Sequence, residues 1–247
     1  MKKALLLFLL ISSCLNAQNG FEQGNALYNK GKYGEAITAY EGVLKTKKHS
    51  AELYFNIANS YYKLNKVGPS IYNYEKALLL SPNDKEIQNN LNFAKKAAID
   101  DIKEVPNVGF NKMIQDVTSV YQYNTWAWIA VGFSFVFLLL FLGYYLSGTT
   151  LSKRLFFIGM FIALLIIAIS ISSAIFEKSI YERDRPAIVF EDILPVKTEP
   201  KADAPDAFLL HEGAKVYILD TLDTWRKIQL TDETQGWVEE KAIKEIK

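Results

Sequence analysis

The sequence predicts a multidomain membrane protein, in which an all-α domain, two transmembrane helices and a small all-β domain follow one another along 247 residues. Three observations support this prediction: two long apolar runs, side chains that recur with a fixed period, and short alternating segments near the C-terminus. The net charge of +1, without a basic patch interleaved with aromatic residues, gives no indication of nucleic-acid binding.

Two uncharged apolar runs are long enough to cross a lipid bilayer. Residues 126–146 form a run of 21 residues, and residues 155–176 form a run of 22. As helices, each would reach roughly 31–33 Å, which matches a hydrocarbon core about 30 Å thick. Two buried helices of a soluble core are the alternative, but the rest of the chain has too little apolar sequence to cover them. We therefore predict two transmembrane helices.

The N-terminus has the layout of a secretory signal peptide. Two lysines precede the short apolar run of residues 4–11, and small polar residues then lead to Ala17. This pattern predicts a cleaved signal peptide over residues 1–17. The stretch "ISSC" offers an alternative, because it resembles a lipoprotein processing box that would leave Cys14 as a lipidated N-terminus.

An exported N-terminus would fix the orientation of the membrane segments. The chain would cross inward at residues 126–146 and return at 155–176, so residues 147–154 are predicted to form a cytoplasmic loop. Lys153 and Arg154 agree with this orientation, because short cytoplasmic loops are enriched in Lys and Arg. The inverted topology would place both charges outside and would require the signal peptide to be ignored.

The segment that precedes the first apolar run, residues 101–125, has two interpretations. Phe110, Met113, Val117 and Tyr121 recur at helical spacing, which predicts an amphipathic helix. This helix either lies on the outer leaflet of the membrane or is an ordinary linker helix.

Side chains recur at a constant spacing in the N-terminal part of the chain. The matched pairs are Asn25 and Asn59, Tyr28 and Tyr62, Ile37 and Ile71, Tyr40 and Tyr74, Glu41 and Glu75, and Leu44 and Leu78. This spacing of about 34 residues, together with stretches such as "NIANSYYKLNKVGPSIYNYEKALLLSPND", resembles the tetratricopeptide repeat, a helix–turn–helix unit. The resemblance implies an all-α domain over residues 18–100, with two repeats and a capping helix from about residue 84 to 99.

The repeat family implies a binding surface as well as a fold. In its geometry, the first helix of each repeat lines a concave groove that holds an extended peptide or a helix of a partner protein. Asparagine suits such a groove, because its amide group both donates and accepts hydrogen bonds. A clamp for a C-terminal carboxylate is not predicted, because Phe21 and Glu86 stand where lysines would be needed. The residues that the resemblance assigns to the groove are Phe21, Asn25, Tyr28, Asn29, Phe55, Asn59, Tyr62, Lys63, Asn89, Phe93 and Lys96.

The composition changes after the second apolar run. The segments "AKVYILDT" and "WRKIQLT" alternate between apolar and polar residues, which predicts short strands and a small barrel. Their order, ending in "GWV", resembles the bacterial SH3 domain and implies an SH3-like barrel over residues 186–247 after a linker at 177–185. Tyr217, Trp225 and Trp237 are its candidate surface residues, with a place in the barrel core as the alternative for the two tryptophans.

The sequence offers little that would support catalysis. Its two histidines, His49 and His211, belong to different predicted domains, and neither a Gly-rich phosphate loop nor a metal-ligand spacing is present. We therefore predict that the protein is not an enzyme and that it has no cofactor or metal site.

The order of these modules resembles the BatE family of Bacteroides aerotolerance proteins. The resemblance implies a non-enzymatic scaffold of the inner membrane, with both soluble domains in the periplasm. The partners it implies are membrane proteins with von Willebrand A domains and a MoxR-type ATPase system, in an envelope complex linked to stress tolerance. The alternative function is a peptidoglycan-binding anchor that acts through the SH3-like domain.

Overall fold

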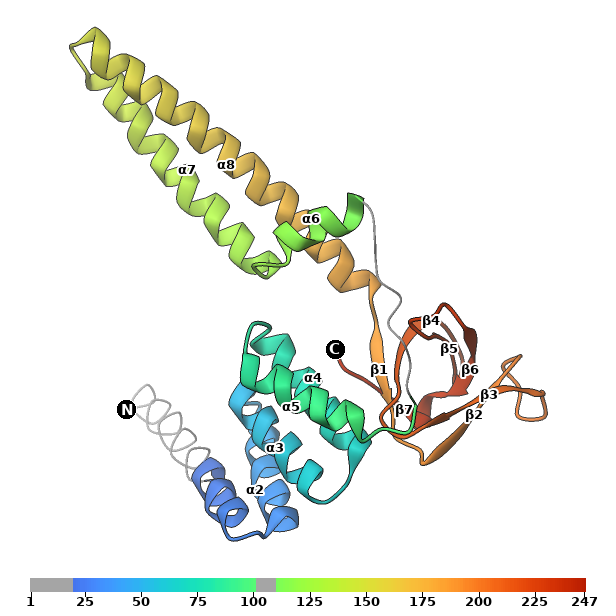
Figure 1. The fold of residues 1–247 in the computed structure, drawn as a ribbon. Helices are drawn as coiled ribbons and strands as arrows, with labels where there is room; N and C mark the ends of the chain where they lie inside the picture. The colour runs from blue at the N-terminus through green and yellow to red at the C-terminus, as the bar shows by residue number, and fades with distance from the viewer. Residues whose placement is uncertain (1–19, 101–109) are drawn as a thin grey trace, which may run out of the picture. The chain divides into compact units, whose positions relative to one another are not determined.

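The computed structural model describes residues 20–100 and 110–247, which fall into two compact units (Figure 1). The first unit combines the N-terminal helices, up to residue 105, with the C-terminal residues 185–247. The second unit comprises residues 106–184. The predicted signal peptide, Cys14 and residues 101–109 of the predicted linker lie outside the described residues.

The N-terminal half of the first unit consists of helices that pack in chain order. Serine and aspartate cap two of them, as expected where helical N–H groups lack partners. Ser50 Oγ accepts a hydrogen bond from the Leu53 N–H at 3.1 Å, and the Asp84 side chain accepts from the first turn of the last helix. This helical region fits the predicted repeats. The helices are a segment over residues 20–29, α2 (Tyr33–Lys45), α3 (Ala51–Lys63), α4 (Val67–Leu80) and α5 (Lys85–Lys96).

The recurring residues form the core of this helical region. Tyr40 and Tyr74, which occupy equivalent positions of the two repeats, are each only 1% exposed. A Cβ atom at Gly24 would lie 2.3 Å from the Tyr40 ring, and the corresponding Ala58 is fully buried. Small residues therefore stand where the helices approach each other most closely, which explains their place in the repeat pattern.

The C-terminal half of the first unit is a single antiparallel sheet of seven strands. Its order is β3-β2-β6-β5-β4-β1-β7. Valine, leucine and isoleucine side chains from all parts of the sheet form one core cluster. The strands are β1 (Pro186–Val189), β2 (Ile193–Lys197), β3 (Asp206–His211), β4 (Lys215–Leu222), β5 (Trp225–Gln229), β6 (Gln235–Glu239) and β7 (Ile243–Glu245), with a short 3₁₀ helix, η1 (Glu240–Ala242), before β7.

The predicted closed SH3-like barrel is not confirmed, because the sheet is open. Strands β3 and β7 are its two ends, and no ladder joins them among the described strands. The register shifts where β3 has one extra residue opposite Val196 and Lys197 of β2, and where β4 has one extra residue between Ile218 and Asp220. Bulges bend and twist strands. The sheet therefore curls around its core, with residues of both end regions in the same cluster, without closing.

Strand β1 is buried on both faces and belongs to two cores. Successive side chains of a strand point to opposite faces. Ala187 and Val189 pack in the core of the sheet, whereas Ile188 packs among the repeat helices. The ring of Phe190, which follows β1, meets the ring of Tyr72 on α4 edge to face, with centroids 5.7 Å apart. The repeat helices and the sheet thus share a hydrophobic core, although the sequence predicted them as separate domains.

The turn between β3 and β4 also packs against the repeat helices. Gly213 has a positive φ of 93°, and a Cβ atom there would lie 3.0 Å from Val67 and 3.1 Å from Ile71 of α4. Glycine is needed both for this backbone conformation and for this close approach. Beside the turn, the His211 N–H and the Asp100 carboxylate form a hydrogen bond of 2.6 Å, and His211 Nδ1 lies 2.8 Å from the same carboxylate.

The sheet covers a face of the repeats that would otherwise be exposed. Helix α5 has the register of a first repeat helix, and in a longer array a second helix would pack against it. Instead, Ile188 and Ile246 share a core cluster with Ile87 and Leu91 of α5. Burial of this apolar face removes an exposed end, which repeat arrays otherwise need a polar cap to protect.

The second unit contains two helices that are long and apolar enough to cross a membrane, α7 (Tyr123–Leu146) and α8 (Thr150–Arg183), as predicted. They run antiparallel in a hairpin, preceded by the short α6 (Phe110–Thr118) (Figure 1). Gly143 of α7 faces the ring of Phe156, and Gly159 of α8 faces Leu140. Small residues thus allow the two helices to pack closely.

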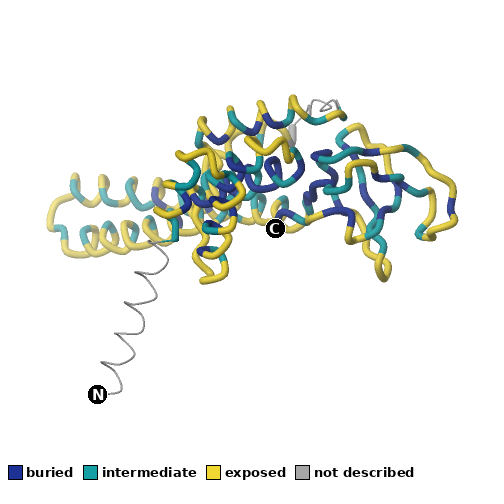
Figure 2. The backbone as a smooth tube through the Cα atoms, turned by 90° about the horizontal axis from the view of Figure 1, so that it is seen from below, coloured by how far each residue is buried: buried dark blue, intermediate teal, exposed yellow. Residues whose placement is uncertain are grey.

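Most of the hairpin surface is apolar and exposed, whereas buried residues concentrate in the helices and sheet of the first unit (Figure 2). Helix α8 also extends past the predicted membrane span to Arg183. Residues 177–183, predicted as a linker, are therefore helical. The pair of Lys178 and Glu182, 3.6 Å apart at i,i+4 spacing, supports this extension.

We expect Ile188→Ala to weaken the repeat helices and the sheet together. The substitution removes a buried side chain from the shared core, and such a loss costs about 2–5 kcal/mol. Hydrogen exchange of the full chain in detergent should show reduced protection of both α4 and β1. The exposed Leu219→Ala on β4 is the matched control and should leave both unchanged. Reduced protection confined to β1 would show that the two parts unfold independently.

Candidate partner-binding cleft

A cleft of about 360 Å³ lies along the first helices of the repeats, and we call it the repeat cleft. Its walls come from the helical segment over residues 20–29 and from α3, α4 and α5. Tyrosine, asparagine and phenylalanine side chains line it, together with one basic and one acidic residue. The lining residues are Tyr28, Asn59, Tyr62, Lys63, Tyr74, Glu86, Asn90 and Phe93.

An asparagine at the base of the first repeat links three helices. The hydroxyl of Tyr40 donates a hydrogen bond to Asn25 Oδ1 at 2.6 Å, and Asn56 Nδ2 donates to the same oxygen at 3.0 Å. Burial raises the pKa of the Tyr40 hydroxyl to about 12. Asn25 therefore has a structural role in joining the helices.

The same arrangement recurs one repeat later, inside the cleft. Asn59 Oδ1 accepts from the hydroxyl of Tyr74 at 2.5 Å and from Asn90 Nδ2 at 3.1 Å. Burial likewise raises the pKa of Tyr74. Because the Asn59 oxygen already has two donors, a bound segment would meet the Nδ2 group of Asn59 rather than its oxygen.

The exposed aromatic side chains of the cleft are its most accessible apolar surface. Tyr62 is 37% exposed and Phe93 is 59% exposed. The ammonium group of Lys96 lies 5.7 Å from the centre of the Phe93 ring, a cation–π contact. Lys63 and Glu86 add one charge of each sign to the lining. The cleft therefore offers aromatic platforms between polar groups, without a strong net charge.

The structure brings together only part of the predicted groove. Tyr28, Asn59, Tyr62, Lys63 and Phe93 line the cleft. The remaining predicted residues have other places. The ring of Phe21 packs on Tyr40 and that of Phe55 on Tyr74, each with centroids 5.9 Å apart. Asn25 joins the helices, and Lys96 borders a second cleft. Asn29 and Asn89 are exposed outside the lining.

The predicted groove residues did not include Tyr74, Glu86 and Asn90, although Glu86 was already placed at a position of the carboxylate clamp. Tyr74 is a core residue, but its hydroxyl bonds Asn59 and the residue also lines the cleft. Glu86, Asn90 and Phe93 have i, i+4, i+7 spacing, which places them on one face of α5. This spacing was available in the sequence and could have found the two polar residues.

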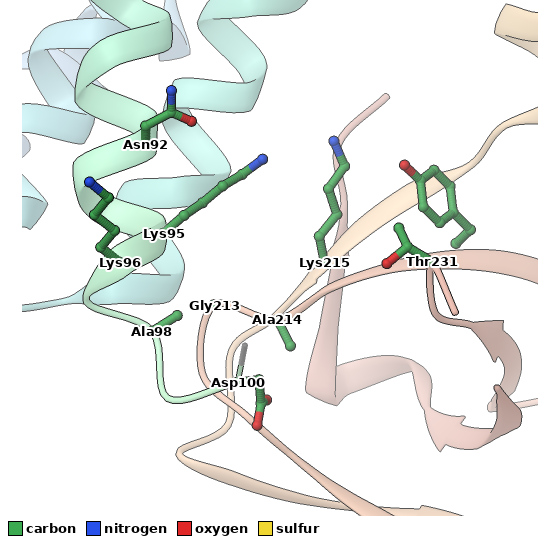
Figure 3. Close-up of a pocket in the computed structure, with 10 residues that line it drawn as sticks. Asn92, Lys95, Lys96, Ala98, Asp100, Gly213, Ala214, Lys215 and Thr231 are labelled. Atoms are coloured by element: carbon green, nitrogen blue, oxygen red, sulfur yellow. The ribbon is translucent and has the colours of Figure 1, made fainter. Parts of the chain in front are cut away.

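A second cleft, of about 430 Å³, lies between α5 and the sheet, and we call it the junction cleft (Figure 3). Figure 3 shows Lys95 on α5 and Lys215 on the side of the sheet extending into the space between them. Glu75 of α4 pairs with both lysines, at 3.7 Å and 2.9 Å. The contacts between α4 and the sheet join residues far apart in the sequence, so sequence reasoning did not detect this cleft. Its lining is Asn92, Lys95, Lys96, Ala98, Asp100, Gly213, Ala214, Lys215, Tyr217 and Thr231.

The three candidate surface residues of the sheet are separated by this arrangement. Tyr217 lines the junction cleft. Trp225 is half-buried and lines a smaller cleft of about 160 Å³. Across β5 and β6, Trp225 pairs with Glu239, and Trp237 pairs with Lys227. Because residues 225 and 227 point to the same face of β5, both tryptophans lie on the outer face of the sheet. Neither belongs to the core cluster of the sheet.

The helical fold and its cleft define a repeat protein of the kind that binds other proteins. Comparison with known families agrees. Residues 24–65 match the family described as TPR repeat, and residues 51–84 match the tetratricopeptide repeat family. The predicted tetratricopeptide repeats are therefore confirmed for this part of the chain.

The chain is also similar to the TPR repeat-containing thioredoxin TTL4 of Arabidopsis thaliana. The two proteins are 24% identical over 153 residues, which cover 47% of this chain and 22% of the plant protein. The chain thus spans less than a quarter of the length of that relative.

We predict that Asn59→Ala destabilises the repeats. The substitution removes the acceptor of the buried Tyr74 hydroxyl, and an unsatisfied buried donor costs about 1–3 kcal/mol. Urea unfolding of the full chain in detergent, followed by far-ultraviolet circular dichroism, measures this loss. Asn89→Ala removes an exposed asparagine from the same region and should leave the midpoint unchanged. Equal midpoints for the two variants would show that the Asn59 hydrogen bonds add nothing to stability.

Proposed function

We propose that this protein is a non-enzymatic membrane scaffold that binds an extended segment of a partner protein in the repeat cleft. The open cleft with its exposed aromatic side chains carries this proposal. The sheet packs against α4 through β1, and no sheet residue is among the described residues that line the cleft. Tyr62 and Phe93 are the expected anchors, because aromatic side chains dominate the energetics of many interfaces.

The shared core of the repeats and the sheet supports a hairpin that crosses the membrane twice. Two parts that pack on one core must lie on the same side of a membrane. The residues between them, 106–184, contain α7 and α8, and two crossings return the chain to the side that it left. A single crossing would separate Ile188 from the repeat helices that bury it.

The proposed orientation places both soluble parts in the periplasm and the α7–α8 loop in the cytoplasm. The basic residues next to this loop, Lys153 and Arg154, support it, as does the signal-peptide pattern over residues 1–17. The order of modules, which resembles that of BatE proteins, supports a place in a Bat-type envelope complex linked to stress tolerance. Its partners would be von Willebrand A-domain membrane proteins and the MoxR-type ATPase system.

The cysteine content of the sequence favours a binding role over dithiol–disulfide chemistry. Thioredoxin forms part of the name of the plant relative. Exchange between a dithiol and a disulfide needs two cysteines, and this sequence contains one, Cys14. The two histidines make separate contacts: His49 with the Tyr54 hydroxyl at 2.7 Å, and His211 with Asp100.

Loss of both exposed aromatic anchors should abolish partner binding. In Tyr62→Ala with Phe93→Ala, each truncation of an anchor is expected to cost about 2 kcal/mol, roughly a 30-fold loss of affinity. Co-purification of von Willebrand A-domain proteins from solubilised membranes is the measurement. Leu80→Ala, at an exposed leucine outside the cleft, is the matched control.

Retention of these partners at wild-type levels by the double variant would show that the cleft is not the binding surface. The outer face with Trp225 and Trp237 would then be the better candidate. Sedimentation with purified peptidoglycan would test the alternative function, a cell-wall anchor that acts through the SH3-like domain.

The orientation can be tested with single cysteines at exposed sites. Thr150→Cys lies beside the α7–α8 loop and Asp232→Cys lies between β5 and β6. In cells with a permeabilised outer membrane and Cys14→Ser, a membrane-impermeant thiol reagent should label Asp232→Cys alone. Both sites should react after the cells are lysed. Labelling of Thr150→Cys alone in the permeabilised cells, before lysis, would show the inverted topology.

A further inference from the structure

We propose that helix α6 lies in the membrane interface, with Met113 and Val117 inserted among the lipid chains beside the hairpin. This inference rests on the proposed membrane span of α7 and α8 and adds a second, peripheral contact with the bilayer. It concerns a lipid surface as partner. The sequence alone left α6 open between an interfacial helix and an ordinary linker.

Helix α6 is fixed to the hairpin at its C-terminal end. The indole N–H of Trp126 donates to the backbone oxygen of Thr118 at 2.8 Å, and the Thr118 hydroxyl donates to the Glu177 carboxylate. The ring of Tyr121 meets that of Trp126 edge to face, with centroids 5.4 Å apart. Thr118 itself is buried. These contacts tie α6 to the start of α7 and to α8 at the same level.

That level corresponds to the edge of the hydrocarbon core. Trp126 begins the first uncharged run, and Glu177 is the first charged residue after the second. Aromatic residues such as tryptophan and tyrosine concentrate at the boundary between lipid and water. Another aromatic contact, between Tyr123 of α7 and Tyr181 of α8, lies near the same ends of the helices. The Thr118 anchor therefore holds α6 where the bilayer meets water.

The side chains of α6 divide into three sectors around its axis. Thr118 faces the hairpin. Met113 and Val117, one turn apart, are 68% and 62% exposed. Lys112 and Asp116 form an ion pair of 2.8 Å on the next sector. A helix with one apolar strip beside one charged strip is the pattern of helices that lie in a membrane interface.

Lipid is the occupant that continuity with the hairpin favours for the apolar strip. The strip is followed along the chain by Val120, Tyr121 and Trp128, which are also exposed. The surface of α7 beyond them is apolar and exposed over its length, and lipid would cover it. A protein partner would have to cover the strip separately at the point where lipid is already present. Bilayer contact covers both surfaces at once.

Depth-dependent fluorescence quenching tests the proposal in the full chain. Single cysteines at Val117 and at the neighbouring Asp116 carry an environment-sensitive fluorophore, in a Cys14→Ser background reconstituted into phosphatidylcholine and phosphatidylglycerol vesicles. Lipids brominated near the headgroup should quench Val117→Cys about twofold more than Asp116→Cys, because only the former lies on the apolar strip. Met113→Cys, one turn away, provides a second reporter and should behave like Val117→Cys.

A label on α7 separates failure of this inference from failure of the proposed function. Leu139→Cys, near the middle of α7 and exposed, should be quenched most by lipids brominated near the chain ends. Absence of quenching at Leu139→Cys would overturn the membrane span itself. Quenching at Leu139→Cys, with Val117→Cys and Met113→Cys no more quenched than Asp116→Cys, would overturn the place of α6 in the interface. A blue-shifted emission at Val117→Cys without lipid quenching would indicate a protein contact and would also overturn it.

Discussion

The architecture of the first unit depends on the double burial of β1. Because alternate side chains of a strand point to opposite faces, Ala187 and Val189 complete the core of the sheet while Ile188 enters the core of the repeats. The close approach of Gly213 to α4, the pair of His211 and Asp100, and the junction cleft all require the register that β1 sets. A strand that exposed one face to water would remove Ile188 from the core cluster that it shares with residues of α4 and α5.

The repeat network determines what the cleft can offer to a partner. Asn25 and Asn59 were expected to bind a peptide backbone, but their side-chain oxygens join neighbouring helices through Tyr40 and Tyr74. The same residues that give the repeat its period thus hold the helices at a fixed spacing. In the proposed function, contact with a partner therefore falls to the exposed side chains of Tyr62 and Phe93. This division explains why a recurring residue need not be a binding residue.

The apolar α7–α8 hairpin belongs to an insertion within the first unit, since residues 106–184 interrupt a structure made from the sequence on both sides. Helix α6 is the first helix of this insertion. At its other end, the chain runs from Arg183 of α8 almost directly to Pro186 of β1. The strand that joins the two cores is therefore also the strand that follows the membrane segment.

The sequence by itself determined the elements whose signals are local. The repeats follow from the fixed period of their recurring side chains, and the two helices long enough to cross a membrane follow from the length of two apolar runs. Both signals lie within neighbouring segments of the chain. Five of the predicted groove residues line the cleft for the same reason. Only the tertiary structure decided that the sheet stays open, that it packs on the repeats, and that Lys215 meets Glu75. Those contacts join residues far apart in the chain, and the side chains that make them, such as Ile188, look in the sequence like ordinary core residues of their own strand.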